Sequence, residues 1–326
     1  METEERGDTV ESIVVAGQLL VELEHEAGID AYRQHVGGSV ADVAVGLRQL
    51  GITCAVVAAS GRDHLGDQVR ARLARHGVPI RGERGPEPTA LVFRGPQGFL
   101  SRPHGLEERL RRRPTACPLV SGHVALHAEQ PSVWSRSEVA LVTETMAEAA
   151  RGGQLAVSLV ANCWHSDRRE ALLAARDVEQ MVPFAHVVRG NWEDLARMYP
   201  GWSVRGIADR WLALGPGAVV ITGGADGAYA RVRNHRIVVP STPPSVRHAR
   251  RRESGAAFTA GLLHHLHKGG ILTPQGLARP AASEIEQAME FALSIAAAAG
   301  GTAAAGPVSA ASRAKPATPG AGLAAR

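Results

Sequence analysis

The sequence predicts an α/β fold: a mostly parallel central sheet with helices on both faces, together with a small β lid. Short apolar runs alternate with segments of helical period along most of the chain, which is typical of a parallel sheet packed between helices. A length of 326 residues, of which 44% are hydrophobic and 21% charged, suffices for one large core around a single sheet. In folds of this class, ligands bind outside the carboxyl ends of the strands.

The apolar pattern places the elements in order along the chain. Residues 12–23 ("SIVVAGQLLVEL") predict the first strand, and residues 40–51 predict a helix that ends at Gly51. A second helix is expected over residues 66–77, closed by Gly77. The remaining buried runs predict strands at residues 53–60, 154–160, 185–191 and 218–224.

Residues 89–103 interrupt this alternation, because two extended runs flank the turn-rich "RGPQG". These runs predict a hairpin. We expect the lid to come from segments near residues 21–36 and 89–105.

The cysteines and the two termini indicate a reducing compartment. No CxxC pair occurs, so neither a disulfide framework nor a zinc site is predicted; the three cysteines are Cys54, Cys117 and Cys163. The acidic start does not resemble a signal peptide, and the Ala-rich stretch 296–305 is too short and too weakly apolar to span a bilayer. We therefore expect a cytoplasmic protein without a membrane segment. Residues 1–11 and 308–326 lack apolar periodicity and are expected to be disordered.

Arginine clusters give the chain its basic character, with a formal charge of +4 and a pI near 9.3. The clusters lie at residues 109–114 and 247–252, where phosphate or nucleic acid could contact them. Solvated helix faces and loops account for most runs of this kind. A nucleic-acid partner is therefore not expected.

No common phosphate-binding or catalytic motif is present: GxxxxGK[ST], GxGxxG after a strand, HExxH and GxSxG are all missing. Three glycine-containing segments remain as candidates. In "GGSVADVAVGLRQLG", Gly37 and Gly38 allow the backbone to approach a small ligand, and Asp42 is expected in the first helical turn, where it can accept hydrogen bonds from ligand hydroxyls. A tight turn with an acid favoured by the helix dipole explains the same residues.

The second segment, "VVITGGADGAYA", is a buried strand that runs into a turn. The turn is expected either to form one wall of a nucleotide site or to be a plain hairpin, which Asp-Gly favours. Its polar and glycine residues are Gly223, Gly224, Asp226 and Gly227.

The third segment, "RRRESGAAFTAGLL", reads as three arginines followed by the start of a helix. Small residues fill that start, namely Ser254, Gly255, Ala256 and Ala257. Free backbone N–H groups at a helix start can bind an anion without help from side chains. Alone, each of the three segments is a weak signal.

The order and spacing of these segments resemble the ribokinase-like carbohydrate kinases, the PfkB family, over residues 12–307, which we expect to form one domain. The amino-terminal signature of that family, two glycines and a helix ending in leucine-glycine, is similar to "GGSVADVAVGLRQLG". Its GxDxxG pattern matches Gly61, Asp63 and Gly66. Its carboxyl-terminal signature, Asp-Thr-x-Gly-Ala-Gly-Asp-x-Phe, falls on "RRRESGAAF".

The resemblance implies a ribokinase-like sandwich that transfers the γ-phosphoryl group of ATP, with Mg²⁺, to a hydroxyl of a small-molecule sugar or nucleoside. It places substrate binding at Glu22, Gly37, Gly38 and Asp42. It places nucleotide binding at Asn191, Asp194, Thr222, Gly224, Asp226 and Gly227, and it assigns no direct metal ligand. Family members often pair through the lid, which allows a homodimer, although the short "FRGPQGF" hairpin offers little apolar surface.

Several positions depart from the family pattern, and the most serious departure concerns the catalytic base. The family's catalytic aspartate falls on Ala256, directly after the anion-site positions Ser254 and Gly255. Glu253 replaces the first glycine, which puts a carboxylate beside the expected phosphate, and Arg250 replaces the first aspartate. The milder changes are Glu22 for aspartate, Asp42 for asparagine, Asp194 for the glutamate that helps to organise the magnesium-water network, and Val160 and Trp164 for aspartate and arginine; Asn162 is retained.

Removal of a general base typically costs about 10²- to 10⁴-fold in rate, so phosphorylation is predicted to be weak or lost. Two interpretations stay open. The protein is either an ATP-dependent carbohydrate or nucleoside kinase with an altered base, for which Glu253 is the only nearby acid, or an inactive pseudokinase that binds a small ligand, a nucleotide or another protein in a regulatory role. A Glu253 carboxylate near the sugar favours the kinase, and one in solvent favours the binding protein.

Overall fold

The computed structural model describes residues 12–25, 31–82, 84–86, 88–95, 98–102, 123–131, 136–163, 167–241 and 251–301. Some expectations concern residues outside these ranges. They are the disorder of residues 1–11 and 308–326, the arginine cluster at 109–114 and most of the one at 247–252, the thiol of Cys117, and the substituted positions Trp164 and Arg250.

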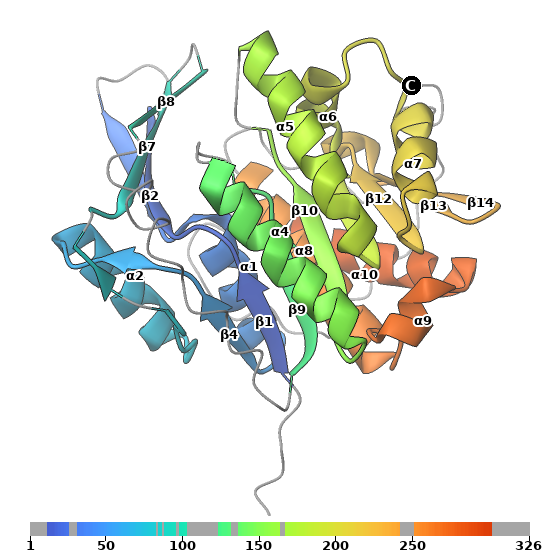
Figure 1. The fold of residues 1–326 in the computed structure, drawn as a ribbon, viewed down its shortest axis with the longest axis horizontal. Coiled ribbons are helices and arrows are strands. Elements are labelled where there is room, and N and C mark those ends of the chain that lie inside the picture. The colour runs from blue at the N-terminus through green and yellow to red at the C-terminus, as the bar shows by residue number, and fades with distance from the viewer. Residues whose placement is uncertain are drawn as a thin grey trace, which may run out of the picture.

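An eight-stranded sheet forms the centre of the molecule, in the order β14-β13-β12-β11-β10-β9-β1-β4 (Figure 1). Its strands are β1 (Ser12–Ala16), β4 (Cys54–Val57), β9 (His123–Glu129), β10 (Ala156–Ala161), β11 (Val187–Asn191), β12 (Ala218–Thr222), β13 (Ala228–Val232) and β14 (His235–Val239). From β4 across to β12 all neighbours are parallel, and only β13 and β14 pair antiparallel. The prediction of a mostly parallel central sheet is confirmed.

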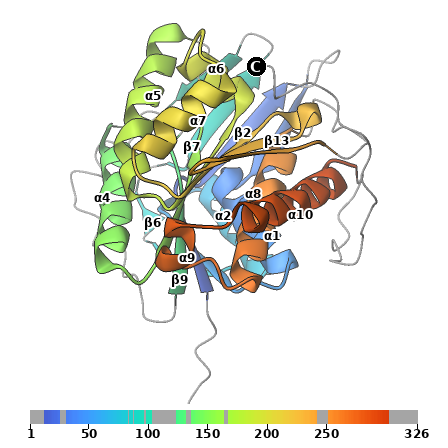
Figure 2. The same ribbon diagram turned by 90° about the vertical axis from the view of Figure 1, so that its right-hand side faces the viewer.

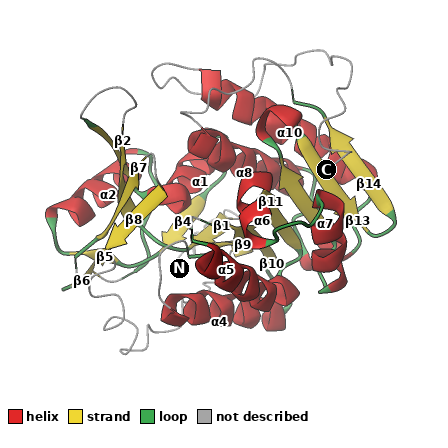
Figure 3. Ribbon diagram, turned by 90° about the horizontal axis from the view of Figure 1, so that it is seen from above, coloured by secondary structure: helices red, strands yellow, loops and turns green. Residues whose placement is uncertain are grey.

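Helices cover both faces of this sheet (Figures 2 and 3). One face carries α1 (Gly38–Gln49), α8 (Arg251–Lys268) and α10 (Ala282–Gly301), and the other carries α4 (Arg136–Gly152), α5 (Arg168–Met181), α6 (Trp192–Met198) and α7 (Val204–Ala213). Alternate residues of β1 serve the two layers, since Ile13 and Val15 pack with the first set of helices and Val14 with the second. The short helix α9 (Pro274–Ala278) links α8 to α10.

A second sheet of four strands, in the order β3-β2-β7-β8, lies at one edge of the molecule, at the left of Figure 1. Its strands are β2 (Leu20–His25), β3 (Tyr32–Val36), β7 (Ala90–Gly95) and β8 (Gly98–Arg102). Helix α2 (His64–Arg75) packs beside it, next to the short pair β5 (Ser60–Gly61) and β6 (Arg84–Gly85). This sheet is formed by the segments from which the lid was expected, and its antiparallel β7–β8 pair is the hairpin expected over 89–103; that the sheet covers a ligand site stays a prediction.

The prediction of one strand over residues 12–23 is wrong, because β1 and β2 belong to different sheets. Gly17 separates them with φ +156, and a Cβ atom there would lie 2.6 Å from Val40 Cγ2. The chain therefore turns out of the central sheet at a point that only glycine accommodates. In the described part of the chain, no helix combines the length and the hydropathy needed to cross a membrane.

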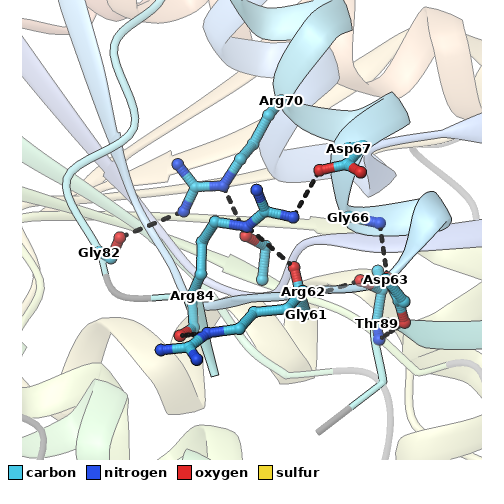
Figure 4. A network of polar contacts seen from close by, with 10 residues as sticks. Gly61, Arg62, Asp63, Gly66, Asp67, Arg70, Gly82, Arg84 and Thr89 are labelled. Carbon is cyan, nitrogen blue, oxygen red and sulfur yellow. Dashed lines mark hydrogen bonds and ion pairs between the residues drawn. The ribbon is translucent and has the colours of Figure 1, made fainter. Parts of the chain in front are cut away.

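Asp63 joins the start of α2 to the residue before β7 (Figure 4). Its Oδ1 accepts hydrogen bonds from the Gly66 amide at 2.8 Å and the Thr89 hydroxyl at 2.7 Å, and its Oδ2 accepts from the Thr89 amide at 2.6 Å. Nearby, Arg70 donates to the Gly82 carbonyl at 3.2 Å. The Gly-x-Asp-x-x-Gly segment thus has a structural role, since its aspartate is the N-cap of α2 and an anchor for the second sheet.

Asp63→Asn is expected to lower the free energy of unfolding at pH 7 by about 1 kcal/mol, because an amide cannot accept from all three donors. Partial burial raises the pKa of the Asp63 carboxyl, but hydrogen bonds from Gly66 and Thr89 outweigh it and hold that pKa below its ordinary value. The stabilisation is therefore complete above the unfolded pKa of about 4 and is lost as the pH falls through the lowered folded pKa.

Urea denaturation at pH 7 and pH 3 measures this difference, with Glu286→Gln on the exposed surface of α10 as the control. The gap between parent and Asp63→Asn should be smaller at pH 3. Equal stability of the two proteins at pH 7 would contradict the anchoring role.

Candidate active site

Strands β9, β11 and β12 end in polar residues at one edge of the central sheet. Their last residues are Glu129, Asn191 and Thr222. Because the strands from β9 to β12 are parallel, their carboxyl ends meet at this edge, where folds of this class bind ligands. The candidate site is built from these strand ends and the helices that start beside them.

The guanidinium of Arg189, near the end of β11, is buried in this site. Its Nη2 donates to Thr222 Oγ1 at 2.9 Å, and its Cζ lies 5.7 Å from the centre of the Phe258 ring on α8. Gly255 of α8 lies beside the guanidinium, since a Cβ atom there would be in ordinary contact with Nη2 at 3.4 Å. The side chain thus links β11, β12 and α8, and no feature of the sequence pattern had singled it out.

Asn191 and Asp194 form a local cap at the start of α6. Asn191 Oδ1 accepts from the Asp194 amide at 2.9 Å, and Asn191 Nδ2 donates to the Asp194 carboxylate. Arg197 Nη1 lies 3.0 Å from Asp194 Oδ1. Burial raises the pKa of Asp194, while Arg197, Asn191 and the more distant Arg189 oppose the shift. The two predicted nucleotide residues are therefore together, but a protein cation already contacts the carboxylate.

Glu129 is a buried carboxylate that sequence reasoning missed. It lies at the end of β9, where the only sequence signal is an acid directly after the apolar run "VALHA". The Ser39 hydroxyl, at the start of α1, donates to its Oε2 by a very short hydrogen bond. His127 Nε2 lies 3.8 Å from Oε1, and His127 Nδ1 lies 3.1 Å from the Ser158 hydroxyl. Glu129 therefore connects the glycine turn before α1 with the strand ends.

The turn before α1 has the conformation that its glycines predict. Gly37 and Gly38 have φ +115 and +76, values that side chains other than glycine rarely adopt. Asp42 lies in the second turn of α1, one residue beyond the first turn where it was expected. Its Oδ1 lies 2.7 Å from Arg72 Nη2 of α2, and Arg72 Nη1 donates to the Val36 carbonyl at 2.6 Å. An arginine therefore already holds this candidate sugar ligand.

Glu22 is the third residue of β2 in the second sheet, and so it does not end a central strand as expected. Its side chain is 1% exposed, and its Oε1 lies 3.0 Å from Arg94 Nε of β7. Like Asp42, it is a candidate substrate acid with an arginine in direct contact. The two acids are held by different arginines on different elements.

In the described residues, helix α8 extends over Arg251–Lys268 and so includes the three residues before the predicted helix start. In a helix that begins there, the N–H groups of Gly255 and Ala256 bond to carbonyls four residues earlier, so they are not free to bind an anion. Ala256 is buried and Glu253 is exposed. The earlier start is consistent with the good helix propensity of arginine and glutamate and with the favourable place of Glu253 in the first turn.

The turn after β12 is a hairpin to β13, as one of the two interpretations expected. Gly223 N–H donates to the Gly227 carbonyl at 2.8 Å, and Gly224, Ala225 and Asp226 form one short 3-10 turn between them. Gly224 and Gly227 have φ +63 and +86. The hairpin explains these residues structurally, and their contact with a nucleotide stays a prediction.

The described residues do not bring together a metal centre with three or more protein ligands. No group of three or more His, Cys, Asp or Glu side chains among them is placed to hold a metal ion. Asp194, the acid predicted to organise the magnesium-water network, is in direct contact with Arg197. At the substituted position in β10, Val160 is buried. The backbone N–H of Asn162 donates to Gln130 Oε1 at 3.1 Å.

Solved structures with the same fold include two fructokinases and a riboside kinase. Fructokinase from Vibrio cholerae O395, a double mutant with fructose, ADP and potassium ion bound, matches with TM-score 0.69 and 20% identity over 91% of this chain and 94% of that chain. Aminoimidazole riboside kinase from Salmonella enterica matches with TM-score 0.69 and 18% identity over 90% and 94%. Fructokinase from Xylella fastidiosa with bound ATP matches with TM-score 0.68 and 20% identity over 88% and 91%.

These likenesses, all at 20% identity or less, establish the ribokinase-like fold. None of the curated proteins matches the chain. The model of the pfkB family carbohydrate kinases matches residues 10–308, which is most of the chain. The protein therefore belongs to the pfkB family of carbohydrate kinases.

Proposed function

We propose that the protein binds a sugar or nucleoside together with an adenine nucleotide, and that it transfers phosphate between them slowly or not at all. The observation that carries the proposal is the pair of residues at the family's catalytic position. Ala256 is buried where the family has its aspartate, and the nearby acid Glu253 is exposed on α8. A solvated carboxylate three residues before position 256 is poorly placed to take a proton from a bound hydroxyl.

The environment of residues 255 and 256 supports the same conclusion. Phosphoryl transfer depends on alignment and on charge stabilisation by preorganised donors. Here the amides that the family would use are inside α8, which begins at Arg251. Both the base and the backbone donors are therefore missing from their family positions, while the buried strand ends remain.

A kinase with an altered base is the second candidate, and Glu129 is the observation that favours it. This carboxylate is buried, and it is close enough to Arg189 to affect the pKa of that side chain. Gly255 also lies near Arg189, because a Cβ atom built there would be 3.4 Å from Nη2. In this version the hydroxyl of the substrate would give its proton to Glu129 instead of to an aspartate at position 256.

Calorimetry with adenine nucleotides and a panel of pentoses, hexoses and nucleosides tests the main proposal, with ADP release followed in the same mixtures. We expect saturable binding and little or no turnover. Robust sugar-dependent ADP release would overturn the degraded-site interpretation, and its loss in Glu129→Gln would then identify Glu129 as the base. Absence of binding by every nucleotide and sugar would contradict the proposal as a whole.

Ala256→Asp alone is not expected to restore strong kinase activity, because the amides beside it stay inside the helix. The double change Ala256→Asp with Glu253→Gly is expected to exceed the sum of the two single changes. Glycine at position 253 removes a charge and lowers helix propensity in the first turn by roughly 1 kcal/mol, which favours opening of that turn. ADP release by the parent, both single variants and the double variant measures this; additive or equal rates would count against the coupling.

Glu22 is proposed to contact the sugar. It is buried on β2, which pairs with β3 directly before the glycine turn, and its Oε1 is oriented by Arg94. Glu22→Gln is expected to weaken binding of the best sugar by about tenfold, the loss of one charge-assisted hydrogen bond. Glu24→Gln is the matched control, since Glu24 lies on the same strand and near the same arginine at 3.9 Å but is 30% exposed. Equal effects of the two variants in calorimetry would reject a specific role for Glu22.

A further inference from the structure

Arg189 is a buried cation without a carboxylate in direct contact. The residue is 8% exposed, and in the described ranges it forms no ion pair and its Nε has no hydrogen-bond partner. Burial lowers the pKa of Arg189 to about 10, with the charges of Asp194 and Glu129 opposing the shift, so the side chain is protonated at neutral pH. Buried charges in folded proteins are normally paired. This guanidinium therefore has capacity for an anion.

The two nearest acids are engaged with other groups. Glu129 accepts the hydrogen bond from Ser39 and has His127 beside its other oxygen. Asp194 accepts from Asn191 and contacts Arg197 at 3.0 Å. Neither carboxylate is in direct contact with the guanidinium, so both stabilise its positive charge only from a distance.

The guanidinium lies at the edge of the sheet where folds of this class bind ligands. It contacts Thr222 at the end of β12 and lies against Gly255 on α8, at the carboxyl edge of the parallel strands. The planar fork of an arginine matches a phosphate oxygen pair, and its free Nε–H adds a donor in the same plane.

A divalent ion would meet two arginines at the same place. Magnesium needs oxygen ligands, usually one or two carboxylates together with substrate phosphates. Here the nearest such carboxylate, Asp194, is already in contact with Arg197 and within electrostatic reach of Arg189. Like charges repel, so these arginines disfavour a metal ion and at the same time replace the charge that it would supply.

We propose that Arg189 receives the terminal phosphate of a bound adenine nucleotide and takes the place of a divalent metal ion there, with Arg197 compensating Asp194. The inference rests on the nucleotide binding proposed above and adds how that nucleotide is held. It concerns binding, and no covalent step is involved.

Titration calorimetry of the full-length protein with ADP and ATP, once with EDTA and once with excess magnesium chloride, tests the metal part. Affinities in the two buffers are expected to agree within about twofold. A gain of about tenfold or more with magnesium would overturn this inference while leaving nucleotide binding in place. No binding of ADP or ATP in either buffer would contradict both the inference and the proposed nucleotide binding.

Arg189→Met, which keeps the bulk and removes the charge, tests the residue. Its affinity for ADP is expected to fall by at least about tenfold, whereas its affinity for adenosine stays unchanged, a difference that a purely structural role would not produce. Arg176→Met, on the exposed surface of α5, is the matched control and should bind both ligands like the parent. Unchanged ADP binding by Arg189→Met, or an equal loss for ADP and adenosine, would overturn the assignment.

Arg189→Lys covers the case in which the methionine variant does not fold. It keeps the charge but loses the planar fork, so ADP binding should weaken less than in a charge-free variant and adenosine binding should again stay the same. If this variant binds ADP as tightly as the parent, or loses affinity for ADP and adenosine equally, the phosphate contact is elsewhere.

Discussion

The buried charge of Arg189 is the interaction on which the carboxyl edge of the sheet depends. A guanidinium in this position must be stabilised by its surroundings, and the ends of β9, β11 and β12 together with α8 provide them through Glu129, Thr222 and the Phe258 ring. Asp194 contributes from the start of α6. Elements far apart in the sequence are thus held to one another around a single positive charge.

Arginines also hold carboxylates in the second sheet and in α1. Arg94 holds Glu22 within the second sheet, and Arg72 of α2 holds Asp42 of α1 while it also donates to a carbonyl of β3. The pairs join the second sheet, α2 and the glycine turn before α1. The two acids predicted to bind a sugar therefore carry structural contacts, so their side chains are oriented in the absence of a ligand.

The sequence predicted the elements with strong periodicity and the residues of recognisable motifs, and the reasons for its failures are local. One apolar run, 12–23, conceals two strands, because hydrophobicity does not reveal a change of sheet at Gly17. Arg189 and Glu129 could not be found from patterns, since each is a charged residue inside a buried strand and only the pairing of strands brings them together. The helix start at Arg251 depends on propensities that the family signature obscured.

The loss of the family's glycine at position 253 and the presence of Arg189 are physically connected. A glutamate in place of a glycine raises helix propensity by roughly 1 kcal/mol and suits the positive end of the dipole, so α8 includes residues before position 254 and the amides of Gly255 and Ala256 become internal. An anion at this edge then loses its backbone donors. In the proposed mode of binding, the Arg189 guanidinium, which lies beside Gly255 in the second turn of α8, supplies charge and N–H groups from a neighbouring strand instead. Phosphate recognition would then depend on one buried side chain, which favours binding but provides no base for transfer.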